Sequence, residues 1–204
     1  MDDDDLRRGR PTCHVKFGED VAILAGDALY AEAFRHLLSE QTGAPEAVLA
    51  AARELAAATG VDGMVGGQYL DVAGVGETGE ELRRLHELKT GRLIAASVVC
   101  ALLLAGMDEE STGAWRRFAA ELGVLFQIVD DILDVTGTDA SLGKSHGSDE
   151  RLGKRTYVSQ FGLDGARVLA QECHGAARGS LREAADAGAP ELEQMTDFIL
   201  TRSA

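Results

Sequence analysis

The stretch Phe126-Gln127-Ile128-Val129-Asp130-Asp131-Ile132-Leu133-Asp134-Val135 places three carboxylates inside an otherwise apolar segment. On an α-helix, the polar residues Gln127, Asp130, Asp131 and Asp134 are spaced i, i+3, i+4 and i+7, so they line one face. Apolar residues fill the remaining faces. This pattern predicts a helix that is buried nearly all round and carries one polar stripe.

Unpaired carboxylates in such a helix would be costly to bury. A hard divalent cation removes that cost, because it prefers oxygen ligands and neutralises their charge. The alternatives are a solvated acidic face, or carboxylates paired with Lys and Arg. The apolar flanks argue against a solvated face, so Asp130, Asp131 and Asp134 are predicted metal ligands.

Length and composition narrow the class of protein. With 204 residues and 45% hydrophobic content, the chain is predicted to form a single domain over residues 1–204. A net charge of −14 argues against nucleic-acid binding. The three cysteines show no metal-binding spacing, which favours reduced thiols in a cytoplasmic protein. The longest uncharged apolar run, 93–107, is too short for a membrane span and is predicted to be a core helix.

Ala, Leu and Glu dominate the chain, and it contains only three prolines. Segments with the period-two pattern of strands are few, so the chain is predicted to be mostly helical. The expected helices are 18–40, 46–60 running on to 72, 80–106, 111–136, 156–186 and 190–201.

The N-terminus carries four acids, 2–5, followed at once by Arg7 and Arg8. A terminal charge run is by default a disordered tail. Metal-binding carboxylates beside guanidinium groups are also what a diphosphate site requires. The residues alone leave both interpretations open.

Two further polar motifs lie between the N-terminus and the acidic stripe. Gln68 and Asp71 are spaced i, i+3 after a run of small residues, which is also typical of a helix C-terminus with surface polar groups. Lys89 and Thr90 stand before Gly91 and the long apolar run. Lys89 is either a surface lysine or a phosphate contact at a turn that Gly91 loosens.

Basic residues follow the acidic stripe directly. Lys144 and Lys154 lie in a glycine-rich loop just past Asp134, but the loop lacks the spacing of a nucleotide-binding P-loop. The five histidines share no ligand spacing, so each is interpreted as an ordinary surface or core residue.

Taken together, the segments DDDLRRGRPTCH, GQYLD, KTG, FQIVDDILD and GKSHGSD…GKRTY resemble the trans-isoprenyl diphosphate synthases, the polyprenyl synthetase family. The segments occur in the family's order and cover nearly the whole chain. Asp130-Asp131-Ile132-Leu133-Asp134 looks like the family's second aspartate-rich motif, DDxxD. The start of the chain looks like the end of the first one.

The resemblance implies an all-α isoprenoid synthase-type bundle around a central cavity, usually a homodimer. It also implies a Mg²⁺-dependent prenyltransferase that condenses an allylic prenyl diphosphate with isopentenyl diphosphate. Apolar helices would enclose the growing chain and exclude water from the allylic cation. The resemblance implies neither a nucleic-acid partner nor a membrane span.

The resemblance also implies roles for individual residues. The metal ligands would be Asp130, Asp131 and Asp134, with Asp2 on the facing side. Arg7, Lys89, Lys144 and Lys154 would bind the allylic diphosphate, and Arg8 would bind isopentenyl diphosphate. Gln127, Thr90 and Gln68 would offer dipoles near the developing carbocation, with Asp71 supporting that region.

The chain departs from the family at its start. Asp2 matches only the last aspartate of the first motif, and the leading pair and the helices before it are absent from the sequence. We therefore expect a bundle that lacks its N-terminal helices. We also expect the 204-residue chain to be inactive or nearly so, while a full-length parent would be a synthase.

Three other interpretations compete with this one. A non-catalytic subunit of a hetero-oligomeric prenyl synthase would keep the fold, but its acidic motifs are expected to be lost, whereas DDILD is intact. A terpene cyclase-like enzyme would share the chemistry of ionisation, but it usually pairs one aspartate-rich motif with a different second motif. A plain helical scaffold would leave the buried polar stripe unexplained.

Overall fold

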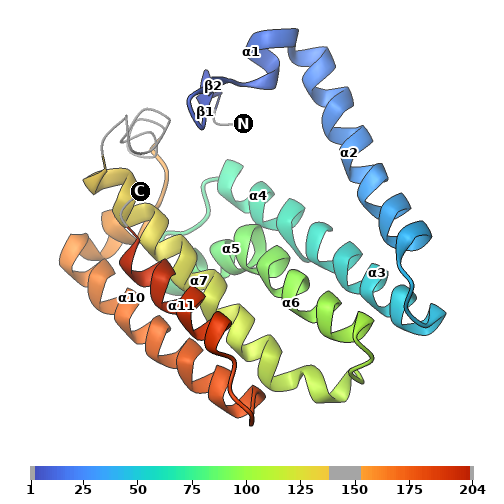
Figure 1. Cartoon of the computed structure of the whole chain (residues 1–204). Coiled ribbons are helices and arrows are strands. Elements are labelled where there is room, and N and C mark those ends of the chain that lie inside the picture. Colours follow the sequence, from blue (N-terminus) through green and yellow to red (C-terminus); the bar gives the residue numbers. More distant parts are fainter. Residues whose placement is uncertain (1–2, 138–152, 203–204) are drawn as a thin grey trace.

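The computed structural model describes residues 3–137 and 153–202, and within these ranges the chain forms an all-α bundle (Figure 1). The described elements are β1 (Leu6–Arg7), β2 (Arg10–Pro11), α1 (Cys13–Phe17), α2 (Glu19–Glu40), α3 (Pro45–Thr59), α4 (Met64–Val72), α5 (Gly79–His86), the π-helix η1 (Glu87–Gly91), α6 (Arg92–Leu104), the 3₁₀-helix η2 (Glu110–Thr112), α7 (Gly113–Thr136), α10 (Tyr157–Ala184) and α11 (Pro190–Thr201). The predicted all-α class is confirmed.

The long helix α7 forms the centre of the packing, with α10 along one side and α6 and η1 along the other. Phe118 and Leu125 of α7 are fully buried. The face of α10 that meets the core carries Ala166, Ala170 and Ala177, which are almost completely buried. Small side chains on this face let the two helices approach closely, so α7 is covered along most of its length.

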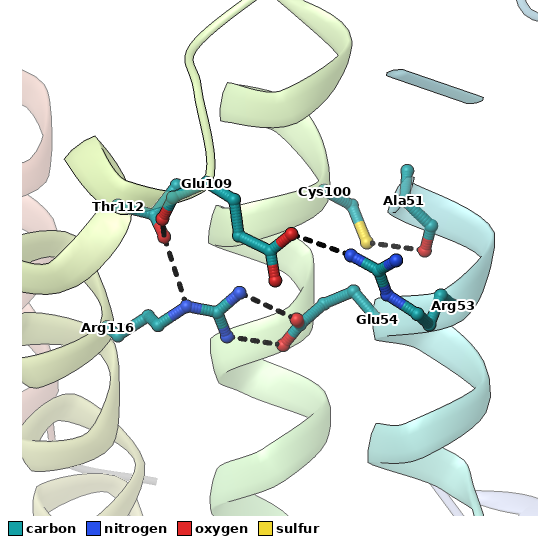
Figure 2. A network of polar contacts seen from close by, with 7 residues as sticks. All are labelled: Ala51, Arg53, Glu54, Cys100, Glu109, Thr112 and Arg116. Atoms are coloured by element: carbon teal, nitrogen blue, oxygen red, sulfur yellow. Dashed lines mark hydrogen bonds and ion pairs between the residues drawn. The ribbon is translucent and has the colours of Figure 1, made fainter. Parts of the chain in front are cut away.

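Helices α3 and α6 pack against each other through Ala51 and Val99, which are both fully buried. The thiol of Cys100 donates a hydrogen bond to the Ala51 carbonyl at 3.3 Å. Figure 2 shows the polar network at the end of this pair, where Arg116 of α7 binds Glu54 of α3 through two hydrogen bonds of 2.9 and 2.8 Å. This pairing fixes α3 to α7 across α6.

Two predicted helices are interrupted in the structure. The helix expected over 46–72 breaks between α3 and α4, where a Cβ added at Gly63 would lie 2.1 Å from the Ala58 carbonyl oxygen. The helix expected over 80–106 contains the π-helix η1, which ends at Gly91. Of the two alternatives left open for Lys89, the turn that Gly91 loosens agrees with this wider helical turn.

Helix α2 stands away from the rest of the bundle, at the right of Figure 1, and none of its residues is buried. Its one hydrogen bond to α3 joins the Tyr30 hydroxyl and Thr59 Oγ1 at 3.0 Å. Ile23, Leu24 and Leu29 are each more than 60% exposed. The α2 helix therefore contributes little to the core of the described chain.

None of the helices in residues 3–137 and 153–202 combines the length and apolar character that crossing a bilayer requires. The cysteines are free thiols at very different depths: Cys13 is exposed, Cys100 is half-buried and Cys173 is buried. Burial raises the pKa of both the Cys100 and the Cys173 thiols.

Candidate functional site

The acidic stripe lies at the C-terminal end of α7, and its members differ in depth. The side chains of Asp131 and Asp134 are buried, at 2% and 5% exposure. Asp130 lies at the solvent edge, with its side chain 52% exposed and its Oδ1 3.5 Å from Arg202 Nη2. The expected single buried face therefore holds Asp131 and Asp134, while the 100° rotation between consecutive residues turns Asp130 outward.

Asp131 is held by hydrogen bonds from two different elements. Gln127 Nε2, one turn earlier on α7, donates to Asp131 Oδ1 at 2.8 Å. The backbone N–H of Tyr157, the first residue of α10, donates to Asp131 Oδ2 at 2.8 Å. Both carboxylate oxygens thus accept hydrogen bonds from the protein itself.

The π-helix η1 places Lys89 and Thr90 beside this stripe. The Thr90 hydroxyl donates to Gln127 Oε1 at 3.1 Å. Lys89 Nζ lies 2.5 Å from Asp71 Oδ2 on α4, with 27% and 13% of the two side chains exposed. The sequence segments around residues 71, 89–90 and 127–134 therefore meet at one place.

Two glycine contacts allow this approach. A Cβ added at Gly67 of α4 would lie 2.2 Å from the backbone nitrogen of Lys89. A Cβ added at Gly123 of α7 would lie 2.6 Å from the Cα of Gly91. Helices α4 and α7 thus pack against η1 through direct backbone contacts on both sides. A side chain at either glycine would displace η1, which carries Lys89 and Thr90.

Gln68 lies next to Gly67 on α4 and is half-buried. It forms no hydrogen bond with a residue in the described ranges, unlike Asp71, which holds Lys89. The two residues that the sequence placed on one face of a helix therefore differ in how firmly the protein holds them.

A cavity of about 540 Å³ lies between the end of α7 and the segment leading into α10. Its lining includes Asp131, Asp134, Lys154, Arg155 and Thr156. The Thr156 side chain caps α10 by accepting a hydrogen bond from the Ser159 N–H at 3.0 Å, so the end of the lining segment is fixed. Carboxylates and cations thus line one space of the size that a small phosphorylated molecule needs.

The N-terminal arginines lie in the hairpin β1–β2, which the sequence did not predict. Arg8 and Gly9 form its turn with φ values of 50° and 71°, the left-handed conformation that tight two-residue hairpins require. Arg7 and Arg8 are exposed, and their guanidinium groups form no ion pair with any residue in 3–137 or 153–202. Asp2 and Lys144, both predicted site residues, lie outside the described residues.

The donor chemistry of the stripe suits a hard divalent cation. Asp130 and Asp134 offer only oxygen ligands, and the described residues that line the neighbouring cavity include no thiol or imidazole. No three His, Cys, Asp or Glu side chains in the described part of the chain are grouped closely enough to hold a metal ion.

Sequence reasoning missed two groups next to the site. His86 is 7% exposed, its ring stacks on Tyr157 at 5.4 Å between centroids, and neither ring nitrogen has a partner among the described residues. Burial, together with the nearby Lys89 charge, lowers the pKa of His86 to about 4. The second missed group is Arg202, whose Nη2 lies 3.5 Å from Asp130 Oδ1. The apolar residues near His86 are the only local sign that it is buried, and no local pattern places Arg202 beside Asp130.

Comparison with known proteins bears on the identity of this site. The sequence profile of the polyprenyl synthetase family matches residues 1–187. The chain is 45% identical to farnesyl diphosphate synthase of Escherichia coli (strain K12), an alignment covering 100% of this chain and 70% of the relative. It is 42% identical to the chloroplastic geranylgeranyl pyrophosphate synthase of Catharanthus roseus, with 99% of this chain and 58% of the relative aligned.

The structure is similar to that of a geranyltransferase from Helicobacter pylori, solved with magnesium and isoprenyl diphosphate. The two share 34% sequence identity with a TM-score of 0.86, over 98% of this chain and 66% of the other. The chain thus spans about 58–70% of these three proteins. The profile match over most of its length, together with these identities, shows that the chain belongs to the polyprenyl synthetase family.

Proposed function

We propose that the protein is a Mg²⁺-dependent prenyltransferase, which condenses an allylic prenyl diphosphate with isopentenyl diphosphate to give a longer prenyl diphosphate. One observation carries this proposal. The Thr90–Gln127–Asp131 hydrogen bonds join η1, which bears Lys89, to the acidic end of α7, beside a cavity lined by Lys154.

The proposed reaction begins when the allylic carbon–oxygen bond breaks and the diphosphate leaves with the electron pair. Negative charge then grows on the diphosphate oxygens. The ammonium groups of Lys89, which Asp71 holds in place, and of Lys154, which lines the cavity, stabilise that charge. We propose the same role for Lys144 and Arg7, and we assign Arg8 to isopentenyl diphosphate.

The carbon that loses the diphosphate becomes an allylic cation. The π-bond of isopentenyl diphosphate attacks this cation, a new carbon–carbon bond forms, and a proton is lost to the released diphosphate. We propose that the Gln127, Thr90 and Gln68 dipoles stabilise the cation. Asp71 holds the Lys89 ammonium group through a contact of 2.5 Å between Asp71 Oδ2 and Lys89 Nζ.

Asp130 and Asp134 are the carboxylates that would hold Mg²⁺, with Asp2 contributing from the facing motif. When bound, the cation would neutralise the leaving diphosphate. The oxygen-only donors at the end of α7 support this assignment. The part of the site that the described residues build is therefore the part that binds the leaving group.

Binding and turnover test the proposal in separate arms. In the first arm, isothermal titration measures inorganic diphosphate binding with Mg²⁺, and we expect Lys154→Gln and Asp130→Asn each to weaken it about tenfold or more. Asp164→Asn is the control, because its side chain is 97% exposed on α10. If the unaltered protein binds no diphosphate in Mg²⁺, the proposal fails.

In the second arm, the protein is incubated with Mg²⁺, dimethylallyl diphosphate and labelled isopentenyl diphosphate, and products are separated by chromatography. Elongated prenyl diphosphate supports the proposed reaction, whereas cyclic hydrocarbons would identify a terpene cyclase. Diphosphate binding without any elongated or cyclic product would support the diphosphate site but contradict the proposed prenyl transfer.

We also propose that the protein works as a homodimer, as the family resemblance implies. Light scattering of the purified chain measures its mass directly. A monomer at all concentrations would contradict this proposal without affecting the assignment of the chemistry.

A further inference from the structure

Asp131 is the most enclosed carboxylate of the DDILD stripe, at 2% exposure. Its two oxygens accept hydrogen bonds of 2.8 Å from Gln127 Nε2 and from the Tyr157 backbone N–H. Asp130, by contrast, is half-exposed and has one long contact of 3.5 Å to Arg202. Adjacent aspartates of one motif therefore occupy very different environments.

The hydrogen bond from the Tyr157 N–H to Asp131 joins the C-terminal part of α7 to the start of α10. Tyr157 is the first residue of α10, a helix of 28 residues, so its N–H is one of the donors that an α-helix leaves without an internal partner. A buried carboxylate there satisfies the donor and interacts favourably with the helix dipole. Lys154, Arg155 and Thr156, which line the cavity, come immediately before it.

The bond to Gln127 extends the connection in the other direction. Gln127 uses its amide nitrogen for Asp131 and its amide oxygen for the Thr90 hydroxyl, at 2.8 and 3.1 Å. Thr90 follows Lys89 in η1. A continuous chain of hydrogen bonds thus links the segment with Lys89 to the segment with Lys154, and Asp131 is its centre.

We infer that Asp131 is a positioning residue, which sets the separation of the Lys89 and Lys154 segments rather than ligating the metal. This inference rests on the proposed function, because it divides the roles within the proposed diphosphate site. If Asp131 turned toward a cation, the buried Tyr157 N–H would lose its acceptor, and a buried donor left unpaired is costly. Asp130 and Asp134 are then the ligands from this motif.

Hydrogen exchange tests the anchor without requiring any activity. In Asp131→Asn, the acceptor of the Tyr157 N–H loses its negative charge, so this hydrogen bond weakens even when the neighbouring amides reorient to keep every link. We expect amide exchange at 157–160 to accelerate about tenfold or more. Asp108→Asn is the matched control, because this exposed aspartate also accepts from a backbone N–H, that of Ser111, but lies before the opposite end of α7. Unchanged exchange at 157–160 in Asp131→Asn would overturn the inference.

A second measurement uses the unaltered protein, which avoids any folding defect of the variant. If Asp131 were a metal ligand, adding Mg²⁺ and inorganic diphosphate would release the Tyr157 amide and speed its exchange. We expect its protection to hold or increase under conditions where titration shows that diphosphate is bound. A drop in protection on binding would show that Asp131 moves to the metal.

Metal and diphosphate affinities separate positioning from a purely structural effect. We expect Asp131→Asn to keep its Mn²⁺ affinity, measured by electron paramagnetic resonance, while Asp130→Asn loses about tenfold or more. Diphosphate affinity should fall in Asp131→Asn but stay unchanged in Asp108→Asn. Loss of Mn²⁺ affinity in Asp131→Asn equal to that in Asp130→Asn would refute the inference. Absence of diphosphate binding in the unaltered protein would refute the proposed function instead, while the exchange result still decides the anchor.

Discussion

Gly67 and Lys89 meet backbone to backbone, so that a Cβ added at Gly67 would lie 2.2 Å from the Lys89 nitrogen. Because the contacted atom is backbone, no flexible side chain can move aside to make room. The position of the Lys89 ammonium group thus depends on a residue that has no side chain at all.

We expect Gly67→Ala to lower the free energy of unfolding by about 2–4 kcal/mol, since overpacking must displace α4 or η1. Gly175→Ala in α10 is the matched control, because a Cβ there meets nothing within 4 Å. In that exposed helix position alanine should stabilise by up to about 1 kcal/mol. Urea unfolding of the two variants measures the difference, and equal stabilities would contradict the close approach.

The Arg116–Glu54 pair should contribute more to stability than the neighbouring Arg53–Glu109 pair (Figure 2). The first has two parallel hydrogen bonds and only 19% exposure at Glu54, whereas both partners of the second are at least 60% exposed. Double-mutant cycles should give coupling energies of about 1–3 kcal/mol for the first pair and below about 1 kcal/mol for the second. The reverse order would contradict the burial argument.

His86 should make stability depend on pH. Burial lowers the pKa of His86 to about 4, while the unfolded chain has the ordinary value near 6.5. Between these values the unfolded state binds the proton and the folded state does not. The free energy of unfolding is therefore unaffected by His86 protonation above pH 6.5. It falls by about 3 kcal/mol as the pH is lowered from 6.5 toward 4.

His86→Phe removes the titrating group and also two buried nitrogens that lack partners among the described residues. We expect the variant to unfold at equal or higher urea concentration at pH 7.5. Its advantage over the unaltered protein should widen at pH 4.5. A difference that stays constant with pH would show that His86 titrates normally in the folded state.

Turnover should depend on Asp130 although this residue is half-exposed. We expect Asp130→Ala, made in any form of the protein that elongates prenyl diphosphates, to reduce kcat/KM by about 100-fold or more. Folding should be unaffected, because Asp130 is not part of the core. Near-normal rates with intact folding would remove Asp130 from the metal site.

Regular segments were predictable because their patterns are local. The last helix was expected over 190–201 and is found as Pro190–Thr201. The helix expected over 111–136 is α7 (Gly113–Thr136), because its apolar periodicity is long and uninterrupted. The class of the fold follows from such segments.

The π-helix η1 depends on contacts between distant residues, so the local pattern could not reveal its geometry. The backbone of η1 contacts Gly67 and Gly123, which lie 22 residues before and 34 residues after Lys89 in the sequence. Likewise, the acidic stripe was predicted from its spacing, but the partner of Asp131 is a backbone N–H 26 residues away. A backbone donor carries no sequence signature.

Helix α2, which has no buried residue, must be stabilised almost entirely by its own backbone hydrogen bonds and local side-chain pairs. Because α2 has few contacts beyond the Tyr30–Thr59 hydrogen bond to α3, it should open more often than α7, and its peptide bonds should become accessible more often. Brief digestion with a protease of broad specificity should therefore cut within 19–40 first. The fragment that survives should begin near α3 and keep the packing of α4 and α7 against η1.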